Sequence, residues 1–226
     1  FKKLDSLSNE EWKIIFEYAK EKKISCFSTP FDEQSVDFLY SLNVPAFKIA
    51  SADITHMPLI KKIAKKNLPI FLSTGMASID EIHEAVNWIK DCGNNQLVLM
   101  HCIISYPTKP EDANLQMIST LTKKFPNQII GYSDHTIGIS APVAAVALGA
   151  KVIEKHITID RRMKGTDQKG SLGPDGVNRM VRDIRLIEQS MGDEDIHISS
   201  STGSAKEKLE RSIASKVNIE KGTKIS

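Results

Sequence analysis

The feature that most constrains the fold is a short apolar run that recurs six times, at intervals of 22 to 31 residues. Each run is followed by a turn and then by an amphipathic stretch typical of a helix. The runs are ISCFST (24–29), AFKIAS (46–51), PIFLST (69–74), LVLMHC (97–102), QIIGYS (128–133) and VIEKHI (152–157). This spacing is that of one strand–helix unit, and apolar strands alternating with helices indicate a parallel sheet.

The helices are predicted from their end signals as well as their periodicity. Two open with a capping box, a serine (Ser8 or Ser78) followed three residues later by a glutamate. Pro142 fits best within a first helical turn, so its helix should begin near Ser140. The expected helices cover 8–22, 32–42, 78–93, 138–149 and 173–192.

Six successive units preceded by a helix predict a (β/α)₈ TIM barrel whose first two strands lie outside these residues. An open doubly wound sheet has the same periodicity and stays an alternative. We expect the partial barrel domain to cover 1–192 and a polar, serine-rich linker to cover 193–210. Residues 211–226 alternate like β-strands and are expected to begin a second, small domain.

Polar and reactive side chains gather at the carboxyl ends of the predicted strands, which favours the barrel. A barrel collects its strand ends in one mouth, whereas an open sheet spreads them along an edge. The residues at these ends are Ser28, Thr29, Lys48, Ser51, Asp53, Ser73, Thr74, His101, Tyr106, Ser133, Asp134, His135 and His156.

Two of these histidines occupy corresponding positions in the last two units. His135 lies in GYSDHT and His156 in VIEKHIT, so both should end neighbouring strands. Two imidazoles so placed can bind one divalent cation and leave positions open for water and substrate oxygens. We predict a metal site at His135 and His156 with Asp134 orienting an imidazole. The alternative is that each is a hydrogen-bonded packing residue, as we expect for His101.

The strand ends also carry a pattern suited to anions. Thr29, Ser51, Ser73 and Ser133 supply hydroxyl groups, and Lys48 interrupts an otherwise apolar strand. A lysine buried there needs a counter-charge, and hydroxyls around an ammonium group suit a phosphate or a carboxylate. For each hydroxyl alone, capping of the next helix is the alternative. No glycine-rich nucleotide-binding loop is present.

Composition argues against several kinds of partner. The 226 residues carry 30 basic and 28 acidic side chains without a dense basic block, so nucleic-acid binding is not indicated. No apolar run approaches the roughly 20 residues of a membrane-spanning helix. The three cysteines, Cys26, Cys92 and Cys102, are an odd number at wide spacing. We therefore expect no disulfide framework and a reducing, cytoplasmic location.

The strings STPF, FKIAS, LSTGM, HC…YPT, GYSDHT and EKHIT, in this order, resemble the sialic acid synthase family. Its members include N-acetylneuraminate, legionaminate and pseudaminate synthases. The resemblance extends from about residue 8 to the C-terminus. The closing RSIASKVNIEKGTKIS is similar to the start of the family's C-terminal antifreeze-like (SAF) domain.

The resemblance implies a transferase that condenses phosphoenolpyruvate with an N-acetylated aldose such as N-acetylmannosamine. The product would be a nine-carbon 2-keto sugar acid, and phosphate would be released. A divalent ion, Mn²⁺ or Mg²⁺, would polarise the aldehyde. His135 and His156 match the family's metal ligands and, with Lys48, are the implied catalytic residues. Lys48, Thr29, Ser51, Ser73 and Ser133 match phosphoenolpyruvate-binding positions, and Tyr106, Asp53 and Asp167 match contacts to the acceptor sugar.

Two residues depart from the family pattern. Ile104 stands where the family has Asn or Ser, and Asp53 where N-acetylneuraminate synthases have glutamate. The family's first two strands supply an acid/base glutamate and a further lysine, so the resemblance implies that these residues alone are inactive. It also implies a homodimer. Another phosphoenolpyruvate-dependent 3-deoxy sugar acid synthase and a non-catalytic sugar-binding barrel stay as alternatives.

Overall fold

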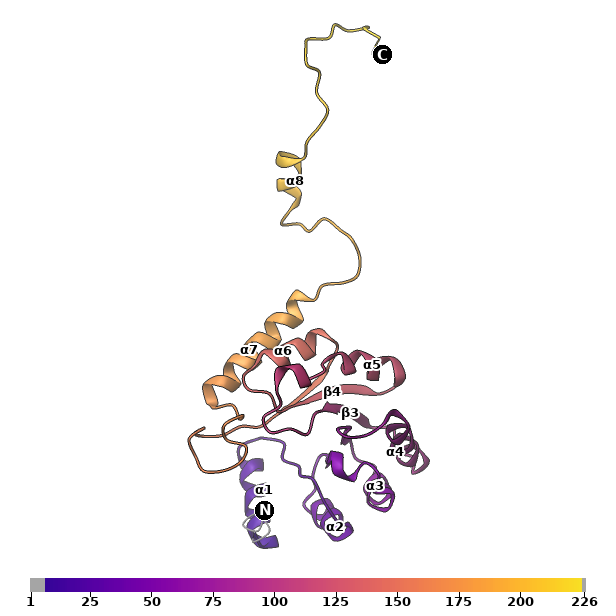
Figure 1. Ribbon diagram of the computed structural model, residues 1–226, viewed down its shortest axis with the longest axis vertical. Helices are drawn as coiled ribbons and strands as arrows, with labels where there is room; N and C mark the ends of the chain where they lie inside the picture. Colours follow the sequence, from indigo (N-terminus) through magenta and orange to yellow (C-terminus); the bar gives the residue numbers. More distant parts are fainter. Residues whose placement is uncertain (1–6, 225–226) are drawn as a thin grey trace. The chain divides into compact units, whose positions relative to one another are not determined.

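The computed structural model describes residues 7–224 and contains a five-stranded parallel sheet (Figure 1). Its strands are β1 (Phe47–Ile49), β2 (Ile70–Ser73), β3 (Leu97–Cys102), β4 (Ile129–Asp134) and β5 (Val152–Lys155). They lie side by side in sequential order, each parallel to its neighbours. The order never reverses as it would in a doubly wound sheet, so the open-sheet alternative is not supported.

The sheet is curled, as contact between side chains of its first and last strands shows. Lys48 Nζ on β1 lies 3.5 Å from Glu154 Oε2 on β5. In a flat sheet these strands would be about 19 Å apart, four spacings of about 4.8 Å, which two side chains cannot bridge. The sheet therefore forms a half-barrel.

Five of the six predicted strands are confirmed, and the first is not. Residues 24–29 belong to no strand or helix, and one backbone bond, from Lys48 N to Ser28 O at 3.3 Å, joins them to β1. The Phe27 ring stacks on Phe71 of β2, with centroids 5.2 Å apart. A single hydrogen bond does not make a ladder, so this apolar run lies along the sheet without becoming its sixth strand.

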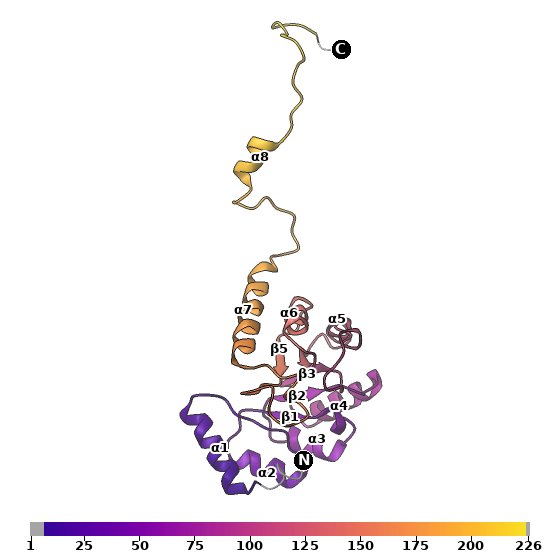
Figure 2. The same cartoon turned by 60° about the vertical axis from the view of Figure 1, so that its left-hand side comes forward.

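The helices lie around the outside of the sheet, as the views in Figures 1 and 2 show for α2 to α6. Both predicted capping boxes are present, with Ser8 and Ser78 each accepting a backbone N–H at 3.3 Å. The main-unit helices are α1 (Asn9–Glu21), α2 (Glu33–Ser41), α3 (Met57–Ala64), α4 (Ile79–Asp91), α5 (Gln116–Lys124), α6 (Ser140–Ala147) and α7 (Pro174–Ser190), with 3₁₀ turns η1 (Ser51–Asp53) and η2 (Pro110–Asp112). The short helices α3 and α5 were not among the predicted helices, although α3 has Pro58 in its first turn, the signal that marked the start of α6.

Strand alternation gives the sheet an apolar outer face and a more polar inner face. Phe47, Leu72 and Leu99 point to the helices and are fully buried in the core. Each such side chain contributes about 1.5–3 kcal/mol by burial. Residues paired across parallel strands share a face, so the register gathers Lys48, Phe71, Ser73, Met100, Cys102, Ser133 and Glu154 on the inner face.

The chain divides into two compact units between Met191 and Gly192. In the second, the seven-residue helix α8 (Gly203–Leu209) lies within the segment 193–210 that was expected to be a linker. The strands expected in 211–226 do not form in its described part, to residue 224. A strand needs a neighbour to pair its backbone groups, and this unit supplies none. No helix within residues 7–224 is both long and apolar enough to cross a membrane.

Candidate active site

The inner face carries a continuous polar chain that crosses the half-barrel. Lys48, with 13% of its side chain exposed, donates from Nζ to Ser73 Oγ at 2.7 Å and faces Glu154 at 3.5 Å. Ser133 Oγ donates to Glu154 Oε1 at 2.6 Å. An ammonium group has three donors, so Lys48 keeps one for a further acceptor. Two hydroxyls, one ammonium and one carboxylate thus meet at the strand ends.

Glu154 is the member of this group that the prediction missed. The requirement for a counter-charge to Lys48 was recognised, but its position was not. A signal was present, because Glu154 is an acidic residue inside the apolar run VIEKHI. Assigning it to the inner face needed the register between β4 and β5, which pairs Ser133 with Glu154.

A third hydroxyl, that of Ser51, borders the same group. Ser51 Oγ accepts a hydrogen bond from Gly75 N at 3.1 Å, and a Cβ on Gly75 would lie only 2.9 Å from that oxygen. The glycine of LSTGM is therefore required for this close approach. Burial raises the pKa of the Cys102 thiol, although the Ser51 and Ser133 hydroxyls act in the opposite direction. Thr29 is half-buried and makes no side-chain hydrogen bond to the group within residues 7–224.

His135 and His156 directly follow β4 and β5, and their rings lie together. The centroids are 5.1 Å apart and the planes meet at 78°. His135 Nδ1 is 2.8 Å from the Ile103 carbonyl oxygen. Because a carbonyl can only accept, Nδ1 carries the proton and Nε2 keeps a free lone pair. Burial lowers the pKa of His135, against the effect of the Ile103 hydrogen bond, so the ring is neutral at neutral pH.

The expectation that Asp134 orients an imidazole is wrong. Its Oδ1 accepts from Tyr132 OH at 3.0 Å and Thr136 N at 2.8 Å, and its Oδ2 lies 2.6 Å from Lys155 Nζ. The Ile103 carbonyl holds His135 instead. Strand alternation explains the error, because Asp134 belongs to the opposite face from Ser133.

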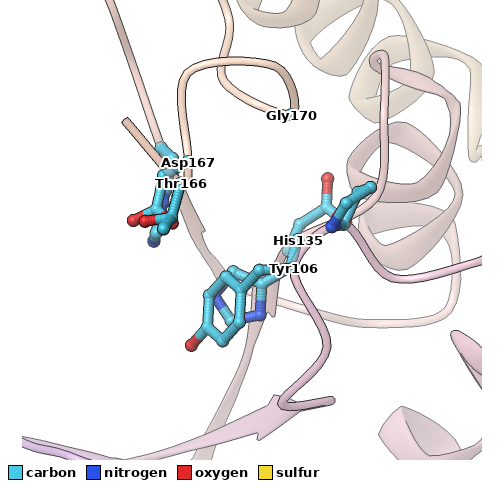
Figure 3. A pocket seen from close by; sticks show the side chains of 8 residues that line it. Tyr106, His135, Thr166, Asp167 and Gly170 are labelled. Atoms are coloured by element: carbon cyan, nitrogen blue, oxygen red, sulfur yellow. The ribbon is translucent and has the colours of Figure 1, made fainter. Parts of the chain in front are cut away.

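Tyr106 and the loop after β5 complete a cavity around the two histidines. The Tyr106 ring centroid lies 4.2 Å from that of His135 and 5.8 Å from that of His156. Asp167 Oδ2 is 3.4 Å from His156 Nδ1. Figure 3 shows Tyr106 beside His135, with Asp167 facing them from a separate loop. The lining residues are Tyr106, Pro107, Asp134, His135, His156, Thr166, Asp167 and Gly170.

Asp53 stands in the 3₁₀ turn that follows β1. Its Oδ2 is buried without a hydrogen-bond partner among the described residues, and Oδ1 is 4.0 Å from His56 Nδ1. Burial raises the pKa of Asp53. A carboxylate left partly unpaired in this way is costly to the fold.

His101 is the structural histidine that was expected. It is buried, and its Nε2 lies 2.9 Å from the Ala113 carbonyl oxygen. Its ring stacks on Tyr132 in the outer face, with centroids 5.5 Å apart.

The two histidines have the donor atoms that a divalent cation needs. His135 and His156 offer two imidazoles, each with Nδ1 facing an oxygen, an arrangement that leaves Nε2 available as a ligand atom. Within residues 7–224 no group of three or more His, Cys, Asp or Glu side chains is arranged to hold a metal. These two residues fit a site completed by water or substrate oxygens.

Comparisons with known proteins identify the family of the chain. The model of the NeuB family matches residues 1–196. The chain is 48% identical, over 226 residues, to an uncharacterised protein of Methanocaldococcus jannaschii, covering all of this chain and 66% of that protein. It is 41% identical to N-acetylneuraminate-9-phosphate synthase of Mus musculus (97% and 61% covered). It is 43% identical to N,N'-diacetyllegionaminic acid synthase of Campylobacter jejuni (93% and 63% covered).

A solved structure gives the same result for the fold. N-acetylneuraminic acid (sialic acid) synthetase from Leptospira borgpetersenii, in complex with citrate, superposes with a TM-score of 0.83 at 36% identity. The superposition covers 91% of this chain and 73% of that one. The chain spans 61% to 66% of the length of the three curated relatives, so the activities of those whole proteins are not established for this chain by similarity.

Proposed function

This chain belongs to the NeuB family, and we propose that it is the phosphoenolpyruvate-binding and metal-binding part of a synthase of sialic-type sugar acids. In the proposed reaction, C3 of phosphoenolpyruvate forms a bond to the aldehyde carbon of an open-chain acetamido sugar. Water adds at C2, and cleavage of the C2–O bond releases inorganic phosphate. The product is a nine-carbon 2-keto sugar acid. The relatives named for N-acetylneuraminate-9-phosphate and diacetyllegionaminic acid support an acetamido acceptor.

The observation that carries the proposal is the inner-face chain of Ser73, Lys48, Glu154 and Ser133 next to the paired histidines. Phosphoenolpyruvate presents a phosphate and a carboxylate, and both are met by charge-assisted hydrogen bonds. Lys48 has a free donor for this anion, and Glu154 keeps the ammonium group in place when no anion is bound. Thr29 and Ser51 are the further hydroxyls proposed at this position.

The acceptor sugar is proposed to bind in the cavity beside the histidines. Tyr106 and Asp167 line that cavity, and Asp53 has an unpaired buried oxygen. His135 and His156 would hold a divalent cation, Mn²⁺ or Mg²⁺, through their Nε2 atoms. When bound, such a cation polarises a carbonyl oxygen as a Lewis acid. The hydrogen bond of His135 Nδ1 to Ile103 keeps the ring in the tautomer that this role needs.

Further features of the whole protein are proposed on the same grounds. The half-barrel and its likeness to a sialic acid synthetase support a complete TIM barrel. The three cysteines are free, which supports a reducing compartment such as the cytoplasm. A homodimer and a C-terminal SAF domain rest on the family resemblance of the sequence.

The test is phosphate release from phosphoenolpyruvate, measured with a panel of acceptors on the full natural product of the gene. We expect release with Mn²⁺ and an N-acetyl hexosamine such as N-acetylmannosamine or its 6-phosphate, and none without a sugar. Release only with aldoses that lack an acetamido group would instead indicate a 3-deoxy sugar acid synthase. No phosphate release with any sugar would indicate the non-catalytic sugar-binding barrel. Ile104, which stands where the family has a polar residue, is the feature that favours this alternative.

A further inference from the structure

A buried ion pair lies next to both histidines in the sequence and at the end of the same two strands. Asp134 and Lys155 are partners in the last rung of the β4–β5 ladder. Asp134 Oδ2 is 2.6 Å from Lys155 Nζ, and the two side chains are 0% and 3% exposed. His135 and His156 are the next residues on their respective strands.

The pair fastens the backbone directly after His135. Asp134 Oδ1 accepts from the Thr136 amide at 2.8 Å and from Tyr132 OH at 3.0 Å. Lys155 Nζ also donates to the Thr136 carbonyl oxygen. The Thr136 carbonyl is therefore tied directly to the strand that carries His156, and the Thr136 amide is tied to it through Asp134 and the ion pair, so the segment holding His135 cannot shift without breaking these bonds.

Further bonds continue this frame to neighbouring segments. The His135 carbonyl accepts from Thr108 N at 2.9 Å, and the His156 carbonyl accepts from Leu172 N at 2.9 Å. These backbone bonds hold His135 to the loop that follows β3 and His156 to the loop that precedes α7. The ion pair and the hydrogen bond from Lys155 Nζ to the Thr136 carbonyl oxygen join the two strand ends to each other, one residue beyond the Ser133–Glu154 hydrogen bond.

A buried ion pair is weak evidence for stability alone, because two apolar side chains of similar volume often stabilise a core as well or better. The hydrogen bonds that satisfy such a pair can instead fix the relative position of the segments that it joins. We propose that Asp134 and Lys155 are positioning residues that set the separation of the His135 and His156 imidazoles. Through that separation they set the affinity of the pair for a divalent cation. The inference rests on the proposed metal role of these two histidines.

The decisive variant is Asp134→Asn combined with Lys155→Met. The asparagine oxygen can still accept from Thr136 N, and the methionine side chain fills the space of the lysine stem. The double variant leaves no unpaired charge buried, whereas each single variant would leave one and would unfold more easily. The matched control is Ile130→Val, a buried β4 residue whose shortening weakens the core without touching the strand ends.

The readout is binding of Cu²⁺ alone, by calorimetry and by electron paramagnetic resonance, without substrates. Cu²⁺ stands at the top of the affinity order for nitrogen ligands, so a two-histidine site gives a measurable constant. We expect the double variant to bind Cu²⁺ about 10- to 100-fold more weakly, as removal of outer-shell partners does. It should also lose the spectrum of two coordinated nitrogens. Ile130→Val should bind like the wild type.

Wild-type Cu²⁺ affinity in the folded double variant would overturn the positioning role and leave the proposed function intact. A wild type that binds Cu²⁺ no better than His135→Ala would overturn the proposed metal role and this inference together, so the two failures are distinct. If the double variant does not fold, Tyr132→Phe removes one donor to Asp134 and should weaken Cu²⁺ binding about 3- to 10-fold. Unchanged affinity there would likewise overturn the proposal.

Discussion

Replacement of Lys48 by methionine tests whether its ammonium group binds the anionic substrate. Nζ uses two donors, on Ser73 Oγ at 2.7 Å and toward Glu154 at 3.5 Å, and the third is available to phosphoenolpyruvate. A hydrogen bond to a charged group contributes about 1.5–3 kcal/mol. That free energy corresponds to a factor of about 10 to 150 in a dissociation constant. We expect the KM for phosphoenolpyruvate to rise by this factor.

The same substitution should change stability little. Glu154 is 38% exposed and 3.5 Å from the ammonium group, and such a solvent-screened pair contributes about 0–1 kcal/mol. Methionine also preserves the packing of the lysine stem. The urea midpoint of Lys48→Met should therefore stay close to that of the wild type, so that a change in KM reports binding and not unfolding.

Lys66→Met is the matched control. Its side chain is 20% exposed, against 13% for Lys48, and its Nζ lies 2.7 Å from Asp37 Oδ1 at a distant helix surface. The assay is phosphate release at varied phosphoenolpyruvate concentration and saturating acceptor. A rise in KM of less than about threefold in Lys48→Met, or an equal rise in both variants, would refute the assignment of Lys48 to the anion site.

Three further outcomes follow from burial. Asp53→Asn should raise the unfolding free energy by about 0.5–1 kcal/mol, because it removes a partly unpaired buried carboxylate. The same variant should raise the KM of the acceptor sugar. A destabilised variant with an unchanged KM would contradict both predictions. Burial lowers the pKa of His101, so the unfolded state takes up the proton first as the pH falls below about 6.5, and stability declines there by up to about 1.4 kcal/mol per pH unit. Urea titrations from pH 7.5 to 5 should show that slope, and His101→Gln should reduce the slope. An equal slope in the variant would contradict the assignment of this pH dependence to His101. Leu99→Ala in the fully buried core should cost about 2–5 kcal/mol by urea unfolding, and a loss below about 1 kcal/mol would contradict the assigned packing.

Much of the half-barrel could be predicted because its periodicity and helix caps are local signals. The capping boxes at Ser8 and Ser78 are written in adjacent residues, and the start of α6 at Ser140 follows from the geometry of Pro142. The run at 24–29 has the composition of a strand, but pairing depends on a partner that lies at the right height, which composition does not encode.

The site shows the same division between local and non-local information. The histidines at two strand ends were predictable as neighbours, because parallel strands align their carboxyl ends. The face to which a side chain points depends on register, and one residue of difference reverses it. Register is why Asp134 was assigned to an imidazole and instead pairs with Lys155, and why Glu154 was missed.

The fate of the bridging oxygen of phosphoenolpyruvate tests the central claim most directly. With ¹⁸O at the position that joins C2 to phosphorus, the full natural protein would be incubated with Mn²⁺ and the acetamido sugar that supports turnover. Condensation with cleavage of the C2–O bond predicts that the label leaves in inorganic phosphate and that the sugar acid carries oxygen from water at C2. Label retained in pyruvate or in the sugar acid would mean cleavage of the P–O bond, and would contradict the proposed synthase.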